Sequence, residues 1–281
     1  MSITLDSVKD QDKNVMKFAR FGMFAKGVVY VILGVLTAMA AFNVGGEQAT
    51  GKSGALEFVY SQPFGKFMLA LVALGLLGYV VWRWIQAFKD PEADASDDEK
   101  KRGVKRVGYF ISGLTYGFIA FEAGRMVFSG GSSGGSGGSS QKQSLVAQIL
   151  EMPAGQWIIG LIAAILFGKA IYQFWKSLSG EFDKKVQDSG ELDQRVKSIL
   201  HKAGFVGYLA RGVVVGIIGY FFLKAALQSD SGEVEGTKGA FEFIGSMTAG
   251  PWLLGIVAIG LACYGVFMFV KARYRVMPSS V

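Results

Sequence analysis

The chain has 281 residues, of which 51% are hydrophobic and only 18% are charged. Its mean hydropathy of +0.36 is high for a soluble domain, which argues against a disordered chain and against a nucleic-acid-binding module. One cysteine and one histidine cannot form an internal disulfide or a zinc site. The net charge of +7 is therefore interpreted as basic loops that lie beside anionic lipid headgroups.

Six apolar segments follow one another along the chain. They cover residues 18–42, 64–88, 107–128, 155–176, 203–227 and 251–272. Each is long enough for a helix to cross about 30 Å of hydrocarbon. None shows the alternation of a barrel strand, so we expect an all-α polytopic membrane protein with six transmembrane helices.

Lysine and arginine gather in every second loop. The opposite loops carry only Lys52, Lys66, Lys142 and Lys238. The positive-inside rule therefore places the N-terminal segment 1–17, the linkers 91–104 and 179–200, and both termini in the cytoplasm. We expect the first apolar segment to be retained as an uncleaved span.

Internal repetition is the strongest pattern in the sequence. Adding 185 to the residue number maps Gly22, Gly27, Gly75 and Tyr79 onto Gly207, Gly212, Gly260 and Tyr264. Offsets of 86 and 90 give a weaker middle copy, which contains a Gly/Ser-rich loop at 129–140. The sequence thus predicts three pseudo-symmetric two-helix repeats, at residues 18–90, 105–178 and 201–275. Short pieces at 55–60, 145–150 and 240–245 are too short to span, so we expect them to lie at the outer interface or to dip back into the protein, where Glu57 and Glu242 can meet outer cations.

Four motifs of the first copy carry a family resemblance: Ala25-Lys26-Gly27-Val28-Val29-Tyr30, Gly54-Ala55-Leu56, Gln62-Pro63-Phe64-Gly65 and Gly75-Leu76-Leu77-Gly78-Tyr79. With their weaker copies, these motifs resemble the bacterial membrane proteins called domain of unknown function 1206, in which a two-helix unit occurs three times. The middle copy departs most, with Ser112 where the other copies have Lys26 and Arg211. The resemblance implies the fold and a location in the bacterial inner membrane, and it carries over no functional residues.

Residues 46–53 match the phosphate-binding pattern G-x-x-x-x-G-K-[ST]. That loop binds phosphate when a strand-to-helix turn aims several backbone N–H groups at it. Here the segment follows a predicted membrane helix and lies in an outer loop. We therefore interpret it as an ordinary loop, and no nucleotide or other cofactor is expected.

Ionisable residues inside the predicted spans are the main functional candidates, because they are costly in a bilayer. They are Lys26, Arg211, Lys169, Glu122, Arg125 and Lys224. Lys26 and Arg211 are equivalent residues of the first and third copies, and Glu122 can pair with Arg125 along one helix face. Two hypotheses stay open. Long basic side chains near helix ends either reach out to lipid headgroups as anchors or line a polar pathway.

Glycines recur at equivalent positions of the first, third and fifth spans. They are Gly22, Gly27, Gly108, Gly113, Gly207 and Gly212. The G-x-x-x-G spacings of Gly113 and Gly212 allow close contact between helices in lipid. We expect these three spans to pack on one another around a pseudo-threefold axis.

The sequence contains no Ser-His-Asp set, paired-carboxylate site or metal cluster, so we do not expect an enzyme. Two functions remain. The first is a channel or transporter-like protein with a site between the three repeats. The second is a membrane scaffold or accessory subunit that binds lipid or a protein partner. A polar axis would favour the first function, and a dry axis packed with glycine would favour the second.

Overall fold

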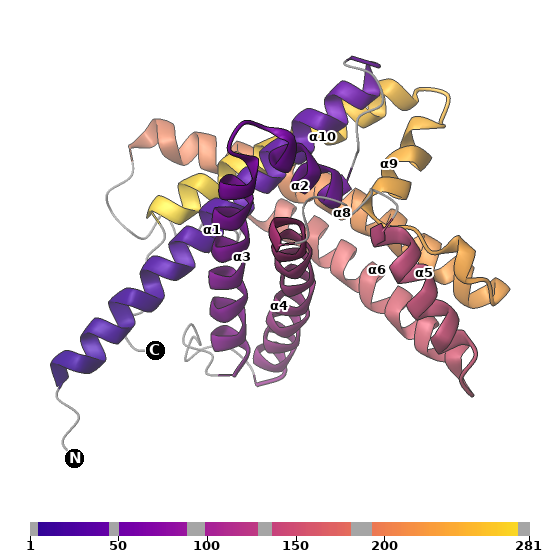
Figure 1. Ribbon diagram of the computed structural model, residues 1–281, viewed down its shortest axis with the longest axis horizontal. Helices are drawn as coiled ribbons and strands as arrows, with labels where there is room; N and C mark the ends of the chain where they lie inside the picture. Colours follow the sequence, from indigo (N-terminus) through magenta and orange to yellow (C-terminus); the bar gives the residue numbers. More distant parts are fainter. Residues whose placement is uncertain (1–4, 45–50, 89–98, 129–136, 181–192, 275–281) are drawn as a thin grey trace.

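The computed structural model describes residues 5–44, 51–88, 99–128, 137–180 and 193–274, and the regular elements in these ranges are all helices (Figure 1). They are α1 (Leu5–Ala41), α2 (Gly51–Ser61), α3 (Gly65–Phe88), α4 (Glu99–Phe128), α5 (Gly137–Leu150), α6 (Gly155–Ser179), α8 (Gln194–Gln228), the short 3₁₀ helix η1 (Ser231–Glu233), α9 (Thr237–Gly245) and α10 (Gly250–Tyr274). The expected all-α fold is confirmed. The expected segment 1–17, linkers 91–104 and 179–200 and Gly/Ser-rich loop 129–140 lie partly outside the described residues.

Each repeat consists of a long helix, a short helix and a second long helix. These are α1, α2 and α3 in the first repeat, α4, α5 and α6 in the second, and α8, α9 and α10 in the third. The short helices contain the pieces expected at 55–60, 145–150 and 240–245. They form the same turn into the next helix. The N–H groups of Gly65, Gly155 and Gly250 donate to the carbonyls of Gln62, Met152 and Met247 over 2.7 to 2.9 Å.

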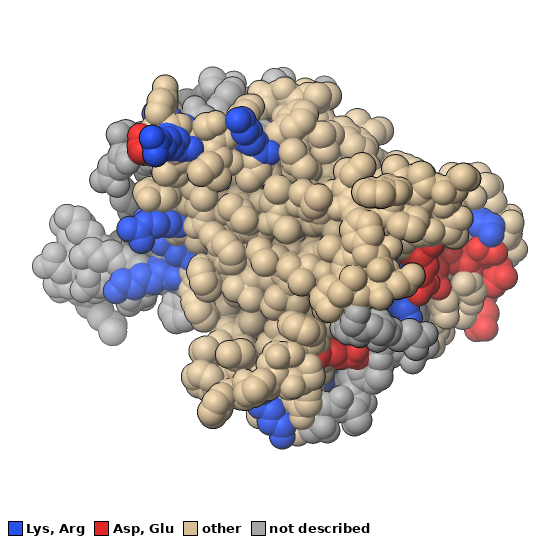
Figure 2. Space-filling view, turned by 90° about the horizontal axis from the view of Figure 1, so that it is seen from above, with Lys and Arg blue, Asp and Glu red and all other residues tan. Residues whose placement is uncertain are grey.

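Five helices are long and apolar enough to cross a membrane: α1 over Ala19–Ala41, α3, α6, α8 and α10. They expose large apolar side chains, such as Leu74 (59%) and Ile256 (65%), as expected for a surface that faces lipid. Figure 2 shows broad uncharged surface between charged groups that gather toward the edges. The expected third span forms the continuous helix α4, but Glu122, Arg125 and several glycines and tyrosines lower its hydropathy. The count of six is therefore not confirmed by composition.

The long helices associate in three close pairs, α1 with α10, α3 with α4, and α6 with α8. Each pair joins neighbouring repeats, because the second long helix of one repeat packs on the first long helix of the next. The pairs diverge from one another in Figure 1. Contacts of α1 with α3 and of α8 with α10 connect them within the first and third repeats. Among the described residues, α4 and α6 of the second repeat make no comparable contact.

The expected packing of the first, third and fifth spans on one another is wrong. In the described part of the chain, α1, α4 and α8 make no extensive contact with each other. Their glycines lie against the second long helix of a neighbouring repeat. A methyl group at Gly27 would lie 2.6 Å from Phe269, one at Gly113 2.5 Å from Trp84, and one at Gly212 2.9 Å from Phe174. The small residues therefore allow close pairing between repeats.

Gly22 and Gly207 serve contacts within a repeat. A methyl group at Gly22 would lie 2.7 Å from the Cα of Tyr79, and one at Gly207 2.7 Å from the Cα of Tyr264. Gly108 is the equivalent residue of the second repeat, and the expectation that it packs a helix is wrong. A methyl group there meets no atom within 4 Å, because α6 does not approach α4 at this level.

Candidate functional site

Lys26 lies on α1 in the interior of the protein, where it is 2% exposed. Its Nζ donates a 3.0 Å hydrogen bond to the hydroxyl of Tyr79 on α3. The same nitrogen lies 4.6 Å from the ring centre of Tyr79, 4.4 Å from that of Tyr116 and 5.4 Å from that of Tyr264. Such cation–π contacts stabilise a desolvated ammonium by about 0.5–2 kcal/mol each. The hypothesis of a lipid anchor is therefore wrong for Lys26, whose ammonium ends among tyrosines rather than at the protein surface.

Arg211, the equivalent residue on α8, approaches the same group of rings. Its guanidinium carbon lies 4.2 Å from the ring centre of Tyr264, 5.3 Å from that of Tyr30 and 6.0 Å from that of Tyr208. The side chain of Arg211 is partly exposed. The structure thus brings together the two basic residues that the repeat offset had matched in sequence.

The tyrosines contact one another as well as the cations. The hydroxyls of Tyr30 and Tyr116 are 3.0 Å apart and share a hydrogen bond. The rings of Tyr30 and Tyr264 pack edge to face at 4.7 Å, and those of Tyr79 and Tyr116 at 4.9 Å. We call this set the cation–tyrosine cluster; it consists of Lys26, Tyr30, Tyr79, Tyr116, Arg211 and Tyr264. Its members come from α1, α3, α4, α8 and α10, so all three repeats contribute to it.

Further basic residues border the cluster. Arg83, one turn after Tyr79 on α3, donates through Nε to the Tyr79 hydroxyl over 2.7 Å and through Nη1 to Gln86 over 2.8 Å. Lys52, at the start of α2, places its Nζ 5.7 Å from the ring centre of Tyr116. The residues 46–50 of the phosphate-loop pattern lie outside the described residues. Lys52 itself points toward the cluster, a role that the sequence analysis did not assign to it.

No carboxylate of the described residues forms an ion pair with Lys26, Arg83 or Arg211. The ion pairs Lys224–Glu233 and Lys238–Glu242 lie on the side of the short helices, and the second joins its two groups over 3.7 Å. Tyrosine rings supply partial negative charge but leave the net charge of the cations in place. The cluster is thus a positively charged centre with hydroxyl groups among its cations, which is suited to hold an anion.

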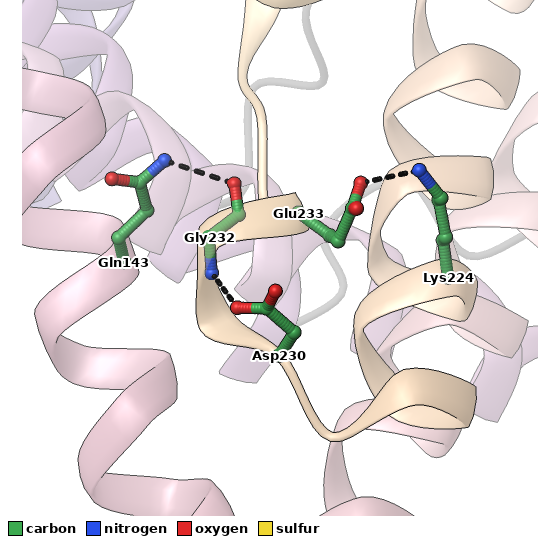
Figure 3. A network of polar contacts seen from close by, with 5 residues as sticks. All are labelled: Gln143, Lys224, Asp230, Gly232 and Glu233. Atoms are coloured by element: carbon green, nitrogen blue, oxygen red, sulfur yellow. Dashed lines mark hydrogen bonds and ion pairs between the residues drawn. The ribbon is translucent and has the colours of Figure 1, made fainter.

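Lys224 lies away from this cluster. Its Nζ forms a 2.7 Å ion pair with Glu233 of η1, and both side chains are partly exposed (Figure 3). Asp230 accepts a 2.8 Å hydrogen bond from the backbone N–H of Gly232. Gln143 of α5 donates to the carbonyl of Gly232 over 3.3 Å. Lys224 therefore holds η1 within the third repeat, and Gln143 of the second repeat contacts the same short helix.

Glu122, Arg125 and Lys169 take three different places. Arg125 is exposed in the last turn of α4, and Glu122 is partly buried, close enough to repel the carboxylate of Glu57. One carboxylate oxygen of Glu57 on α2 is buried without a hydrogen-bond partner. Burial, with the charge of Glu122 second, raises the pKa of Glu57 above its ordinary value. Lys169 on α6 is near enough to Arg211 and Lys52 for their charges to interact.

The sequence analysis missed the tyrosines of the cluster, although a usable signal was present. Tyr30 follows Lys26 by one helical turn, which puts both on one helix face. Tyr116 is its equivalent in the second repeat. A tyrosine that recurs in two repeats, one helical turn from a basic residue inside a span, therefore indicates a polar site to which several repeats contribute.

Comparison with known proteins agrees with the repeat structure. The family model described as Domain of Unknown Function (DUF1206) matches three segments, residues 21–90, 107–180 and 206–275. An "Uncharacterized protein YxxB" of Bacillus subtilis (strain 168) is 34% identical over 275 residues, which cover 97% of this chain and 96% of that protein. No solved structure matches the chain. The resemblance drawn from the four sequence motifs is confirmed.

Proposed function

This chain belongs to the family described as Domain of Unknown Function (DUF1206), and we propose that it is an inner-membrane channel or transporter that binds an anionic group between its three repeats. The single observation that carries the proposal is the place of Lys26. Burying an ammonium group lowers the stability of a protein unless the charge is paired or binds a ligand. Here the ammonium meets a hydroxyl and aromatic faces, and no carboxylate of the described residues pairs with it.

The proposal includes α4 as a sixth span. Its 30 residues exceed the length needed to cross the hydrocarbon. Its lower hydropathy has a functional reason in this arrangement, since Tyr116 faces the cluster rather than lipid. Six spans put both termini on one side of the membrane. The basic loops assign that side to the cytoplasm, where they lie beside anionic headgroups.

The polar centre favours transport over a scaffold role. A scaffold needs only packed helices, and the glycine contacts between repeats would be sufficient for it. Lys26 and Arg211 add charge at the place where the repeats meet, which costs stability unless an anion is held there. In many transporters the substrate site lies between structural repeats near the middle of the bilayer.

Anion flux through purified protein in liposomes tests the proposal. We expect the parent protein to pass chloride or inorganic phosphate above the rate of empty liposomes, and Lys26→Met to reduce the flux to background. Lys66→Met is the matched control, because it removes an exposed charge from α3 without touching the cluster. A parent protein that passes neither anion would contradict the proposal. So would a Lys26→Met variant that keeps its fold and the parental flux.

A further inference from the structure

The second repeat is open where the first and third repeats are closed. Gly22 packs on the backbone of Tyr79, and Gly207 packs on the backbone of Tyr264. The equivalent pair of the second repeat is Gly108 on α4 and Lys169 on α6, and Gly108 contacts nothing there. Gly168 of α6 is likewise without neighbours within 4 Å of an added methyl group. We call the side of α4 that carries Gly108 and the side of α6 that carries Lys169 the α4–α6 seam.

A pair of substitutions between repeats explains why the seam stays open. In the first repeat, a methyl group at Gly75 of α3 would lie 2.5 Å from the Cβ of Ala25 on α1. Gly260 and Ala210 form the same close contact in the third repeat. The second repeat has Ile165 and Ile111 at these two positions. Two branched side chains cannot approach as closely as glycine and alanine do, so α6 is held away from α4.

Lys169 occupies the position that Tyr79 and Tyr264 occupy in the other repeats. Its side chain is partly exposed, and its ammonium has no hydrogen-bond or ion-pair partner among the described residues. Gln173, one turn further along α6, is only 4% exposed, and neither of its amide atoms has a hydrogen-bond partner. The seam therefore carries a cation whose ammonium is unused, and a buried amide without a partner lies one turn further along the same helix.

The entrance of the seam is apolar. Ile111 on α4 is partly exposed, and Ile165 on α6 is 43% exposed. A ligand that fits both features has an apolar part to lie along these side chains and an acidic part to meet Lys169. Anionic membrane lipids have this chemistry, and they are present at high concentration beside the opening.

We propose that an anionic phospholipid enters the protein sideways from the bilayer through the α4–α6 seam and places its headgroup at Lys169. The proposal rests on the proposed function, since it names the class of anion that reaches the centre. The acyl chains stay between α4 and α6, where they cover the exposed apolar side chains. The phosphate accepts hydrogen bonds from Lys169, and it lies near Arg211 and the cation–tyrosine cluster.

Photo-crosslinking in nanodiscs of equimolar phosphatidylglycerol and phosphatidylcholine tests this proposal. A p-benzoylphenylalanine replaces Gly108 in one variant and Ile256, which is exposed on the outward side of α10, in the control. We expect the adducts at residue 108 to contain about fivefold more phosphatidylglycerol than phosphatidylcholine, the preference expected from one lysine beside an acidic headgroup. Adducts at residue 256 should reflect the bulk composition. Lys169→Gln should abolish the enrichment at 108, and Lys66→Gln should leave it unchanged.

A second variant tests the route without removing the charge. Ile111→Ala combined with Ile165→Gly restores the glycine–alanine contact of the other repeats, so we expect α6 to close on α4 and the enrichment to disappear. Bulk composition at residue 108, or enrichment that survives either Lys169→Gln or the closing pair, would overturn lateral entry. If flux of inorganic phosphate still depends on Lys26 in that case, the proposed function stands and only the lipid proposal fails. A parent protein with lipid enrichment but no anion flux would instead leave the proposed function without support.

Discussion

The Nζ of Lys26 on α1 and the hydroxyl of Tyr79 on α3 are joined by a 3.0 Å hydrogen bond in the interior of the protein. The same hydroxyl accepts a second hydrogen bond from Arg83. One phenol therefore serves two cations, and it connects the contact between α1 and α3 to the centre of the three repeats. This arrangement makes Tyr79 the residue whose hydroxyl should matter most to stability.

Tyr79→Phe keeps the ring and removes the hydroxyl. We expect the variant to be less stable by about 1–3 kcal/mol, because the buried Lys26 and the partly buried Arg83 lose their acceptor. Thermal unfolding in detergent measures the effect. Tyr220→Phe is the control, since Tyr220 is 46% exposed. Equal melting temperatures for Tyr79→Phe and the parent protein would show that the hydroxyl does not support the cluster.

Equivalent glycines should respond differently to the same substitution. Gly22→Leu forces a side chain against the backbone of Tyr79 and should cost about 1–3 kcal/mol of stability, as overpacking does. Gly108→Leu should leave the melting temperature unchanged, because the site has open space. The two variants are matched in chemistry and in repeat position. A similar loss in both would mean that the α4–α6 seam is closed in the membrane.

The carboxyl of Glu57 should make stability depend on pH. Its pKa is raised by burial, so the folded protein binds the proton more tightly than the unfolded chain does. The protein therefore loses stability as the pH rises from the ordinary pKa of glutamate to the raised pKa of Glu57. Glu57→Gln should therefore raise the melting temperature at neutral pH. The gain should shrink as the pH falls below the ordinary range of glutamate. Melting curves over pH measure it, with the exposed Glu242→Gln as the control. A gain that does not change with pH would refute this explanation.

Single cysteines test the proposed orientation. In a Cys263→Ala background, Ser246→Cys on the side of the short helices should react with an impermeant maleimide added to intact cells. Ser198→Cys, near the start of α8, should react only after the cells are opened. Both serines are exposed, so a difference in labelling reports the side of the membrane rather than burial. The reverse pattern would place the termini outside the cytoplasm.

The sequence by itself was sufficient for the membrane class, the helical elements and the repeats. Hydrophobic length, the offset of 185 and recurring glycines such as Gly22 and Gly207 are local properties, and each can be read without knowing which helices meet. The same patterns located Lys26 and Arg211 as equivalent residues. They did not tell an anchoring lysine from a buried one, because both occur within about two turns of the end of a predicted membrane span.

Only the tertiary structure decided which helices pair and what surrounds the charges. The long helices pair between repeats rather than around an axis of odd-numbered spans, so Lys26 meets Tyr116 and Tyr264, which are remote in sequence. The open second repeat depends on Ile111 of α4 together with Ile165 of α6, although each residue alone is an ordinary apolar position. Whether two helices pair or stay apart depends on the surfaces of both. The physical reason is that close approach depends on the residues of both helices together.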